Sequence, residues 1–346
     1  MKIEKQEITA LKFSYAVSWF HRYGRLYGVA ASEMAEGGKC IMFPMDHPDQ
    51  IETIWENAGG TMSIAQIRED GSFLAVQNFF KGFQSSTACI VKAVPAESGG
   101  WSVEKYLDLP YVHRFEIVTV GENPFLLAAT LCDKKDFRDD WSHPGRVYLG
   151  RMTKEGRDCR LMPLINGITK NHGYCQMMHD GKHVVAVTGQ EGLFEITVPE
   201  NPDGEWKYEN LIPTEISDVT FVDLDQDGTD EIVTIEKFHG NQIVIYKKDG
   251  QNWNRVYSYP VNFGHVVWGG RILGKPGLLV AYREDNAALI LMRLRKSEQN
   301  RFYMEHTVLD EHEGPTNLAV TGDDSICRIL CSCGKTERVV VYTLVK

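Results

Sequence analysis

Residues 113–130 read HRFEIVTVGENPFLLAAT, and two other stretches align with them almost without a gap. Residues 172–188 read HGYCQMMHDGKHVVAVT, and residues 265–282 read HVVWGGRILGKPGLLVAY. Each stretch starts with histidine and continues as an extended run, a tight turn rich in Gly, Asp, Asn or Pro, and a second, more apolar run. The pattern predicts a β-hairpin that recurs along the chain.

Weaker copies of this hairpin occupy residues 14–32, 62–77, 218–234 and 316–332. The copies start near residues 14, 62, 113, 172, 218, 265 and 316. A third apolar run follows each hairpin, as at residues 145–152 and 241–248, and usually a fourth, as at 101–109 and 254–261. Four strands in each unit of about 50 residues are typical of a β-propeller. We therefore predict an all-β, seven-bladed propeller that forms a single domain over residues 1–346.

The last unit ends at residues 338–345 and lacks a fourth strand, whereas residues 3–11 (IEKQEITAL) form an unassigned strand at the other end of the chain. We expect this N-terminal strand to complete the last blade, because that closure removes a free sheet edge. Two stacked β-sandwich domains are the alternative, but they explain the regular spacing of the copies poorly.

Composition limits the classes of partner. The chain has 346 residues, 43% of them hydrophobic, and a formal net charge of -10 without a basic tract, so a nucleic-acid partner is not expected. No apolar run reaches the length of about 18 residues that a membrane span needs. Residues 1–11 lack the apolar segment of a secretion signal, and the eight cysteines do not form a disulfide framework. We expect a cytoplasmic protein.

One turn carries a candidate calcium site. In residues 223–231 (DLDQDGTDE), oxygen ligands alternate around a glycine that permits a sharp turn. We expect Ca²⁺ to be held by Asp223, Asp225, Asp227, Glu231 and the Thr229 carbonyl. With the Ile-Val that follows, the stretch resembles the FG-GAP/VCBS repeat of integrin-like and bacterial propellers. That resemblance implies a structural ion in the first hairpin of one blade.

In a propeller, the start of each innermost strand and the loop between the second and third strands share one face. His113, His172 and His265 occupy the same first position in three repeats. His143 and His239 both precede third strands, and His312 precedes the last blade. Surface loops that simply contain histidine are the alternative to a functional cluster.

Three converging neutral imidazoles can bind Mn²⁺, Zn²⁺ or Fe²⁺ and leave coordination positions open. We therefore expect His113, His172 and His265 to be the ligands of a divalent transition metal. His143 or His239 would be a fourth ligand or a proton-transfer group, since imidazole titrates near neutral pH.

Cationic and aromatic residues are expected on the same face. The loop of residues 78–86 brings Lys81, and the long loop of residues 132–145 brings Arg138 and Trp141. Such groups suit a polyhydroxylated or anionic ligand, because aromatic rings stack on sugars and cations hold carboxylates. We expect proton transfer or anion binding by Lys81 and Arg138. The expected substrate-binding residues are Arg114, Trp141, Gln190, Glu236 and Arg283.

These features favour an enzyme with a small carbohydrate substrate. The architecture is similar to that of oligogalacturonate lyases and aldos-2-ulose dehydratases, which implies β-elimination on a sugar, uronate or keto-glycoside. One alternative is a non-catalytic, calcium-stabilised propeller that binds glycan or protein. Another is a metal-independent glycosidase with two facing carboxylates from among Asp140, Glu191, Glu236 and Glu284.

Overall fold

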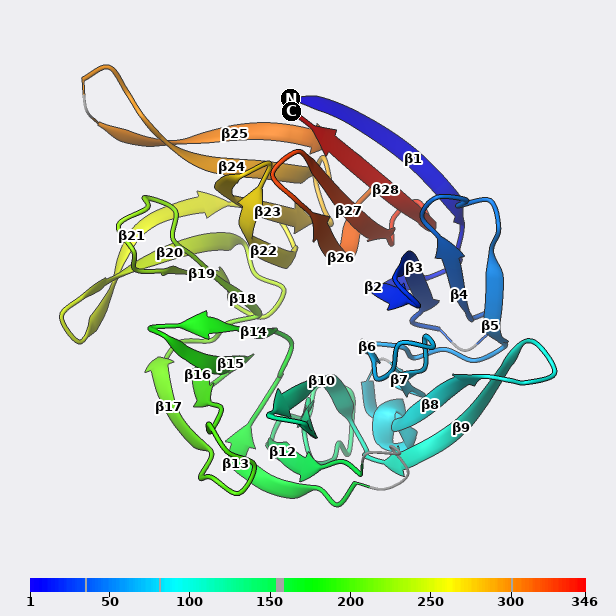
Figure 1. Cartoon of the computed structure of the whole chain (residues 1–346). Coiled ribbons are helices and arrows are strands. Elements are labelled where there is room, and N and C mark those ends of the chain that lie inside the picture. The colour runs from blue at the N-terminus through cyan, green and yellow to red at the C-terminus, as the bar shows by residue number, and fades with distance from the viewer. Residues whose placement is uncertain (35, 81, 154–158, 300) are drawn as a thin grey trace.

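The computed structural model describes residues 1–34, 36–80, 82–153, 159–299 and 301–346. The described residues form 28 strands and one short 3₁₀ helix, η1 (Gly82–Thr87). Figure 1 looks down the central axis of the ring that the strands build, and the seven sheets are arranged around this axis. Each sheet has four strands and pairs neighbours antiparallel, which confirms the predicted seven-bladed β-propeller and excludes two stacked sandwiches.

The strands of the first four blades run outward from the axis in chain order. Blade one contains β2 (Ser14–Arg22), β3 (Arg25–Ser32), β4 (Lys39–Pro44) and β5 (Glu52–Glu56). Blade two contains β6 (Ile64–Gln66), β7 (Phe73–Gln77), β8 (Cys89–Pro95) and β9 (Trp101–Asp108). Blade three contains β10 (Val112–Val120), β11 (Asn123–Thr130), β12 (Gly145–Arg151) and β13 (Met162–Ile168). Blade four contains β14 (Tyr174–His179), β15 (Lys182–Gly189), β16 (Gly192–Thr197) and β17 (Lys207–Ile212).

The last three blades repeat this order, except that the outer strand of blade seven comes from the N-terminus. Blade five contains β18 (Asp218–Val222), β19 (Glu231–Glu236), β20 (Gln242–Asp249) and β21 (Asn252–Pro260). Blade six contains β22 (Gly264–Ile272), β23 (Lys275–Tyr282), β24 (Leu289–Lys296) and β25 (Phe302–Asp310). Blade seven contains β26 (Pro315–Gly322), β27 (Ile326–Cys333) and β28 (Arg338–Val345). Its outer strand is β1 (Lys2–Ala10), as predicted, and the two termini meet there (Figure 1).

The core lies between neighbouring blades. The second strands β7 and β11 are buried on both faces over most of their length, because each sheet packs against the sheets on either side. One apolar cluster joins Ile41 and Phe43 of blade one to Leu330 and Val341 of blade seven. This contact joins the first blade to the last and so closes the ring.

Candidate functional site

Local irregularities in the innermost strands aim side chains at the axis. The register of β10 against β11 shifts between Val112 and Arg114, so His113 is the extra residue of a β-bulge. The same shift in β22 makes His265 the extra residue, and in β2 it selects Tyr15. A bulge turns a side chain out of the alternating pattern of its strand. Three blades therefore use one backbone device to place a ring beside the axis.

These rings surround the axial cavity, a chamber of about 440 Å³ at one end of the channel. Of the residues singled out in the sequence, seven line this cavity. They are His113, Arg138, Trp141, His172, His239, His265 and Arg283. The structure thus brings together side chains from blades three to six, although Lys81 lies outside the described residues.

Four imidazoles form the centre of the site, and we call His113, His172, His239 and His265 the imidazole cluster. The ring of His172 lies 5.1 Å from His113, 4.9 Å from His239 and 5.0 Å from His265, measured between ring centroids. The rings of His239 and His265 stack at 5.2 Å. His172 is therefore the central member of the cluster.

The buried members of the cluster carry unused nitrogen atoms. His113, His172 and His265 are 4%, 1% and 1% exposed, and their Nδ1 atoms have no hydrogen-bond partner among the described residues. Burial, followed by the charges of neighbouring groups, holds the pKa of all three histidines well below the ordinary value. They are neutral at pH 7 and can donate a lone pair to a metal.

The ligand geometry favours a different set of three histidines from the set predicted. Ligand atoms of His172, His239 and His265 lie within 4.8 Å of one another. Three nitrogens at about 2.1 Å from one ion are roughly 3–4 Å apart, so small side-chain movements would complete such a site. Among the described residues, His113 does not belong to this group. It packs on the outer side of His172, against the ring of Phe79 at 5.0 Å.

Aromatic residues fix the position of His239. Its ring stacks between Phe238 at 4.2 Å and Phe263 at 4.7 Å, and its backbone N–H donates to Ser217 Oγ. Phe238, Phe263 and Tyr15 all line the axial cavity and were missed in the sequence. The sequence could have indicated Tyr15, because it occupies the position in the repeat of blade one that His113 and His265 occupy in blades three and six.

Three cations face the same cavity. The ammonium of Lys135 lies 3.3 Å from the centroid of the Trp141 ring, and burial lowers the pKa of Lys135. The guanidinium of Arg283 lies over Phe263 at 5.3 Å. Among the described residues, Lys135, Arg138 and Arg283 form no ion pair with a carboxylate. The cavity therefore offers positive charge to an anionic group.

Several predicted site residues lie elsewhere. His143 approaches Asp136 at 3.8 Å and Asp140 at 4.0 Å in the long loop of blade three, outside the lining of the axial cavity. Gln190 and His312 are also outside it. Glu236 accepts hydrogen bonds from Tyr246 Oη at 2.5 Å and Thr234 Oγ1 at 3.1 Å, so blade five occupies its carboxylate.

The four carboxylates proposed for a glycosidase are not gathered at the cavity. None of Asp140, Glu191, Glu236 and Glu284 lines it. Glu191 Oε2 accepts the backbone N–H of Thr169 at 2.7 Å, and Asp140 accepts hydrogen bonds from Ser142. The carboxylates that do line the cavity are Glu33 and Asp139. The predicted pairs for general acid and base therefore have no support in this geometry.

Arg114 belongs to a second cavity, of about 210 Å³, that also lies among the innermost strands. It donates to the carbonyl oxygens of His172 at 2.8 Å and Met62 at 2.9 Å, so its guanidinium braces the backbone of the imidazole cluster. Glu116 and Asp218 line this cavity too, and burial raises the pKa of each carboxyl to about 7. Arg114, a predicted substrate-binding residue, is therefore not among the residues that line the axial cavity.

These groups give the stability a testable pH dependence. Folded Asp218 keeps its proton up to about pH 7, whereas an unfolded aspartate releases it near pH 4, so this group stabilises the fold as the pH falls from 7 towards 4. The buried neutral histidines lower the stability of the fold as the pH falls below about 6.5, because these histidines then take up protons in the unfolded chain and not in the folded one.

Replacing Asp218 by Asn removes one of the two carboxyl groups whose raised pKa opposes the effect of the histidines, Glu116 being the other. The asparagine keeps an acceptor for the Val267 N–H. From pH 6.5 to pH 5, Asp218→Asn should lose about 2 kcal/mol more unfolding free energy than the unchanged protein, measured by urea titration. Equal losses would contradict the assignment of a raised pKa to Asp218.

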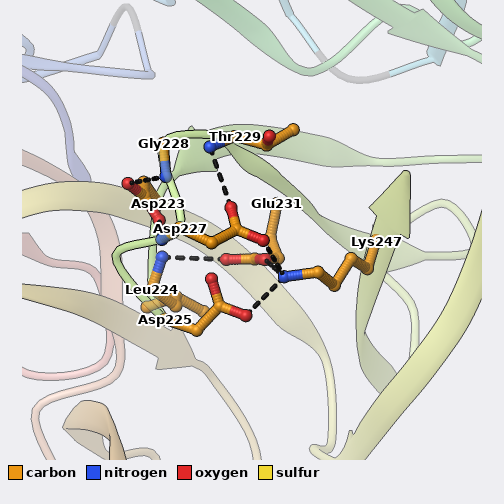
Figure 2. A network of polar contacts seen from close by, with 8 residues as sticks. All are labelled: Asp223, Leu224, Asp225, Asp227, Gly228, Thr229, Glu231 and Lys247. Carbon is orange, nitrogen blue, oxygen red and sulfur yellow. Dashed lines mark hydrogen bonds and ion pairs between the residues drawn. The ribbon is translucent and has the colours of Figure 1, made fainter. Parts of the chain in front are cut away.

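The predicted calcium ligands are partly assembled. Carboxylate oxygens of Asp223, Asp225 and Glu231 lie within 4.8 Å of one another. The ammonium of Lys247 also contacts Asp225, Asp227 and Glu231 (Figure 2). A cation of the chain itself thus already binds the carboxylates chosen for Ca²⁺, and the residues present do not fit a resident calcium ion.

Comparison with known proteins supports the fold alone. No family model matches the chain, which leaves the FG-GAP/VCBS resemblance without family-level support, and no curated protein matches it. A proposed 6-phosphogluconolactonase from Bacteroides fragilis is similar over 86% of this chain and 84% of its own, with 12% identity and a TM-score of 0.52. The Saccharomyces cerevisiae core factor is similar over 99% of this chain, with 10% identity and a TM-score of 0.54. The match spans 60% of the core factor chain.

The sequence predicts no membrane-spanning segment, and the structure can be examined for helices of that kind. In the described part of the chain, no helix has the length and apolar character that a membrane crossing requires.

Proposed function

We propose that this chain is an enzyme that performs β-elimination on a small anionic carbohydrate in the axial cavity. His172, His239 and His265 would hold a divalent transition metal. The observation that carries the proposal is the imidazole cluster itself, which lines an accessible chamber and whose members His113, His172 and His265 have Nδ1 atoms without a hydrogen-bond partner among the described residues. Buried polar atoms are normally satisfied, so an orphaned set at a cavity indicates a ligand.

The donor set suits Mn²⁺, Zn²⁺ or Fe²⁺, since neutral imidazole is a common ligand of all three and none of the described residues that line the cavity is a cysteine. When bound, such an ion polarises a carbonyl or carboxylate oxygen of the substrate. Tyr15 Oη, 3.4 Å from His172 Nε2, orients one of the rings that would hold it.

The remaining residues have separate tasks in the elimination. Arg138 and Arg283 hold the anionic group of the substrate, and Trp141 stacks on the sugar ring. His113 is neutral and takes the proton from the carbon next to the polarised group. The electron pair forms the double bond, and the β C–O bond breaks towards the leaving oxygen. Lys135, whose lowered pKa makes it a better acid, protonates that oxygen and releases an alcohol or water.

Elemental analysis of the purified protein tests the metal part of this proposal. We expect about one equivalent of Mn, Zn or Fe, its loss on treatment with a chelator, and its return on addition of the ion. A protein that contains no transition metal and recovers none after incubation with all three ions would contradict the metal site. It would favour the non-catalytic glycan- or protein-binding propeller.

Product formation tests the chemistry. Uronate-containing oligosaccharides and keto-glycosides should yield a conjugated, unsaturated product with new ultraviolet absorbance, only in the metal-loaded protein. Hydrolysis without a double bond would instead indicate hydrolase chemistry at the same site.

A further inference from the structure

The acidic loop between β18 and β19 is folded around its own hydrogen bonds. Asp223 Oδ1 accepts the N–H of Asp227 at 3.1 Å, and Asp223 Oδ2 accepts the N–H of Gly228 at 3.0 Å. Glu231 Oε2 accepts the N–H of Leu224 at 2.8 Å. These bonds turn the other carboxylate oxygens of the loop towards one point, as Figure 2 shows.

The side chain at that point is Lys247. Its Nζ contacts a carboxylate oxygen of Asp225, lies 2.8 Å from Asp227 Oδ2 and lies 3.1 Å from Glu231 Oε1. Three carboxylates therefore surround one ammonium, as they would surround a metal ion. Burial disfavours the charged lysine, but the hydrogen bonds to the three carboxylates prevail and raise the pKa of Lys247.

The sheet explains why this lysine reaches the loop. The pairing of β19 with β20 starts at Ile232 and Tyr246, so the next residues, Glu231 and Lys247, stand beside each other at the end of the ladder. Lys247 lies on the third strand, outside the loop motif. A long side chain from that position can extend across the loop mouth and present its charge to the carboxylates.

We propose that Lys247 takes the place of the calcium ion in this loop. The carboxylates keep the arrangement of a cation site, and the cation that they bind is the side-chain ammonium of Lys247. Asp225 Oδ1 is buried without a hydrogen-bond partner among the described residues, so one further ligand atom is available to a cation of higher coordination number if the ammonium is removed. Blade five is then independent of dissolved calcium, and calcium should not co-purify with the protein.

Lys247→Met and Lys247→Gln test the proposal, because each removes the charge and keeps much of the side-chain volume. In a chelator, both should lower the melting temperature by about 5 °C, since carboxylates lose their counter-ion. Millimolar Ca²⁺ should restore most of this loss in the variants and leave the unchanged protein within about 1 °C. Lys248→Met is the matched control, because Lys248 pairs with Asp180 at 2.7 Å and stands outside the loop contacts.

Calorimetric titration with Ca²⁺ gives a second measurement that does not depend on thermal unfolding. We expect one binding site in Lys247→Met or Lys247→Gln and none in the unchanged protein or in Lys248→Met. Stoichiometric calcium binding by the unchanged protein would overturn the proposal, since the ion would then displace the lysine. Folded Lys247 variants that neither bind calcium nor gain stability from it would also overturn it.

Discussion

His172→Ala should abolish the bound transition metal and the elimination activity together. The ring of His172 is the centre of the imidazole cluster, within 5.1 Å of His113, His239 and His265 between centroids. Loss of a residue that only orients a ligand typically costs 10–100-fold in metal affinity, so loss of a ligand should cost at least about 100-fold. Elemental analysis after gel filtration and the ultraviolet assay for unsaturated product measure the two effects.

His143→Ala is the matched control. His143 was a candidate for the same site in the sequence, but it lies beside Asp136 and Asp140, outside the axial cavity. We expect this variant to keep its metal and its activity within about twofold. Because alanine leaves a void beside three rings, His172→Asn provides a more conservative replacement, and circular dichroism shows whether each variant is folded.

Opposite behaviour would contradict the site. If folded His172→Ala and His172→Asn retain a full equivalent of metal, the imidazole cluster is not the binding site. Loss of metal in His143→Ala would place it in the blade-three loop instead.

The repeat register allowed the architecture and part of the site to be predicted. His113 and His265 begin two aligned repeats, and the structure shows that both are bulge residues beside the axis. Residues at the same position of aligned repeats point in the same direction relative to the axis, because each blade presents its first strand to the axis in the same way. This argument needs no side-chain coordinates, which is why the sequence was sufficient.

The same argument placed one loop histidine at the cavity, His239, and failed for the other, His143. His143 and His239 both precede third strands, but different loops carry them. The loop after β11 is long enough to take His143 away from the axis. The short loop after β19 turns sharply at His239, which has a positive φ of 47° and lies between two phenylalanine rings. Alignment of the repeats predicts the direction in which a side chain on a strand points. The position of a loop side chain depends instead on packing against residues that are distant in the sequence.

A similar limit applied to the acidic loop. Its nine residues predict a calcium site, but the positive charge that meets the carboxylates comes from Lys247, on another strand. A local motif contains no information on cross-strand neighbours until the strand register is known. Including the third strand in the pattern would have shown lysine opposite Glu231.

Deletion of residues 1–10 should have the largest effect on stability. β1 pairs with β28 from Lys2–Val345 to Ala10–Arg338 and is the only outer strand that blade seven has among the described residues. Most of β1 is exposed, so its contribution comes chiefly from the backbone ladder and from the ion pair of Lys5 with Asp310 at 2.6 Å. At about 0.5–1.5 kcal/mol for each of several hydrogen bonds, the ladder contributes on the order of 4 kcal/mol or more.

We expect the truncated chain to melt on the order of 10 °C lower and to aggregate, because β28 becomes an unpaired edge strand. Calorimetry and light scattering measure the two effects. Lys2→Ala is the matched control, since Lys2 is exposed and its ion pair is with Glu4, two residues away. This substitution should change the melting temperature by less than about 2 °C. A truncated protein that melts as the full chain does and stays monomeric would mean that closure through β1 does not stabilise the ring. The contact of Phe43 with the blade-seven cluster would then have to hold it alone.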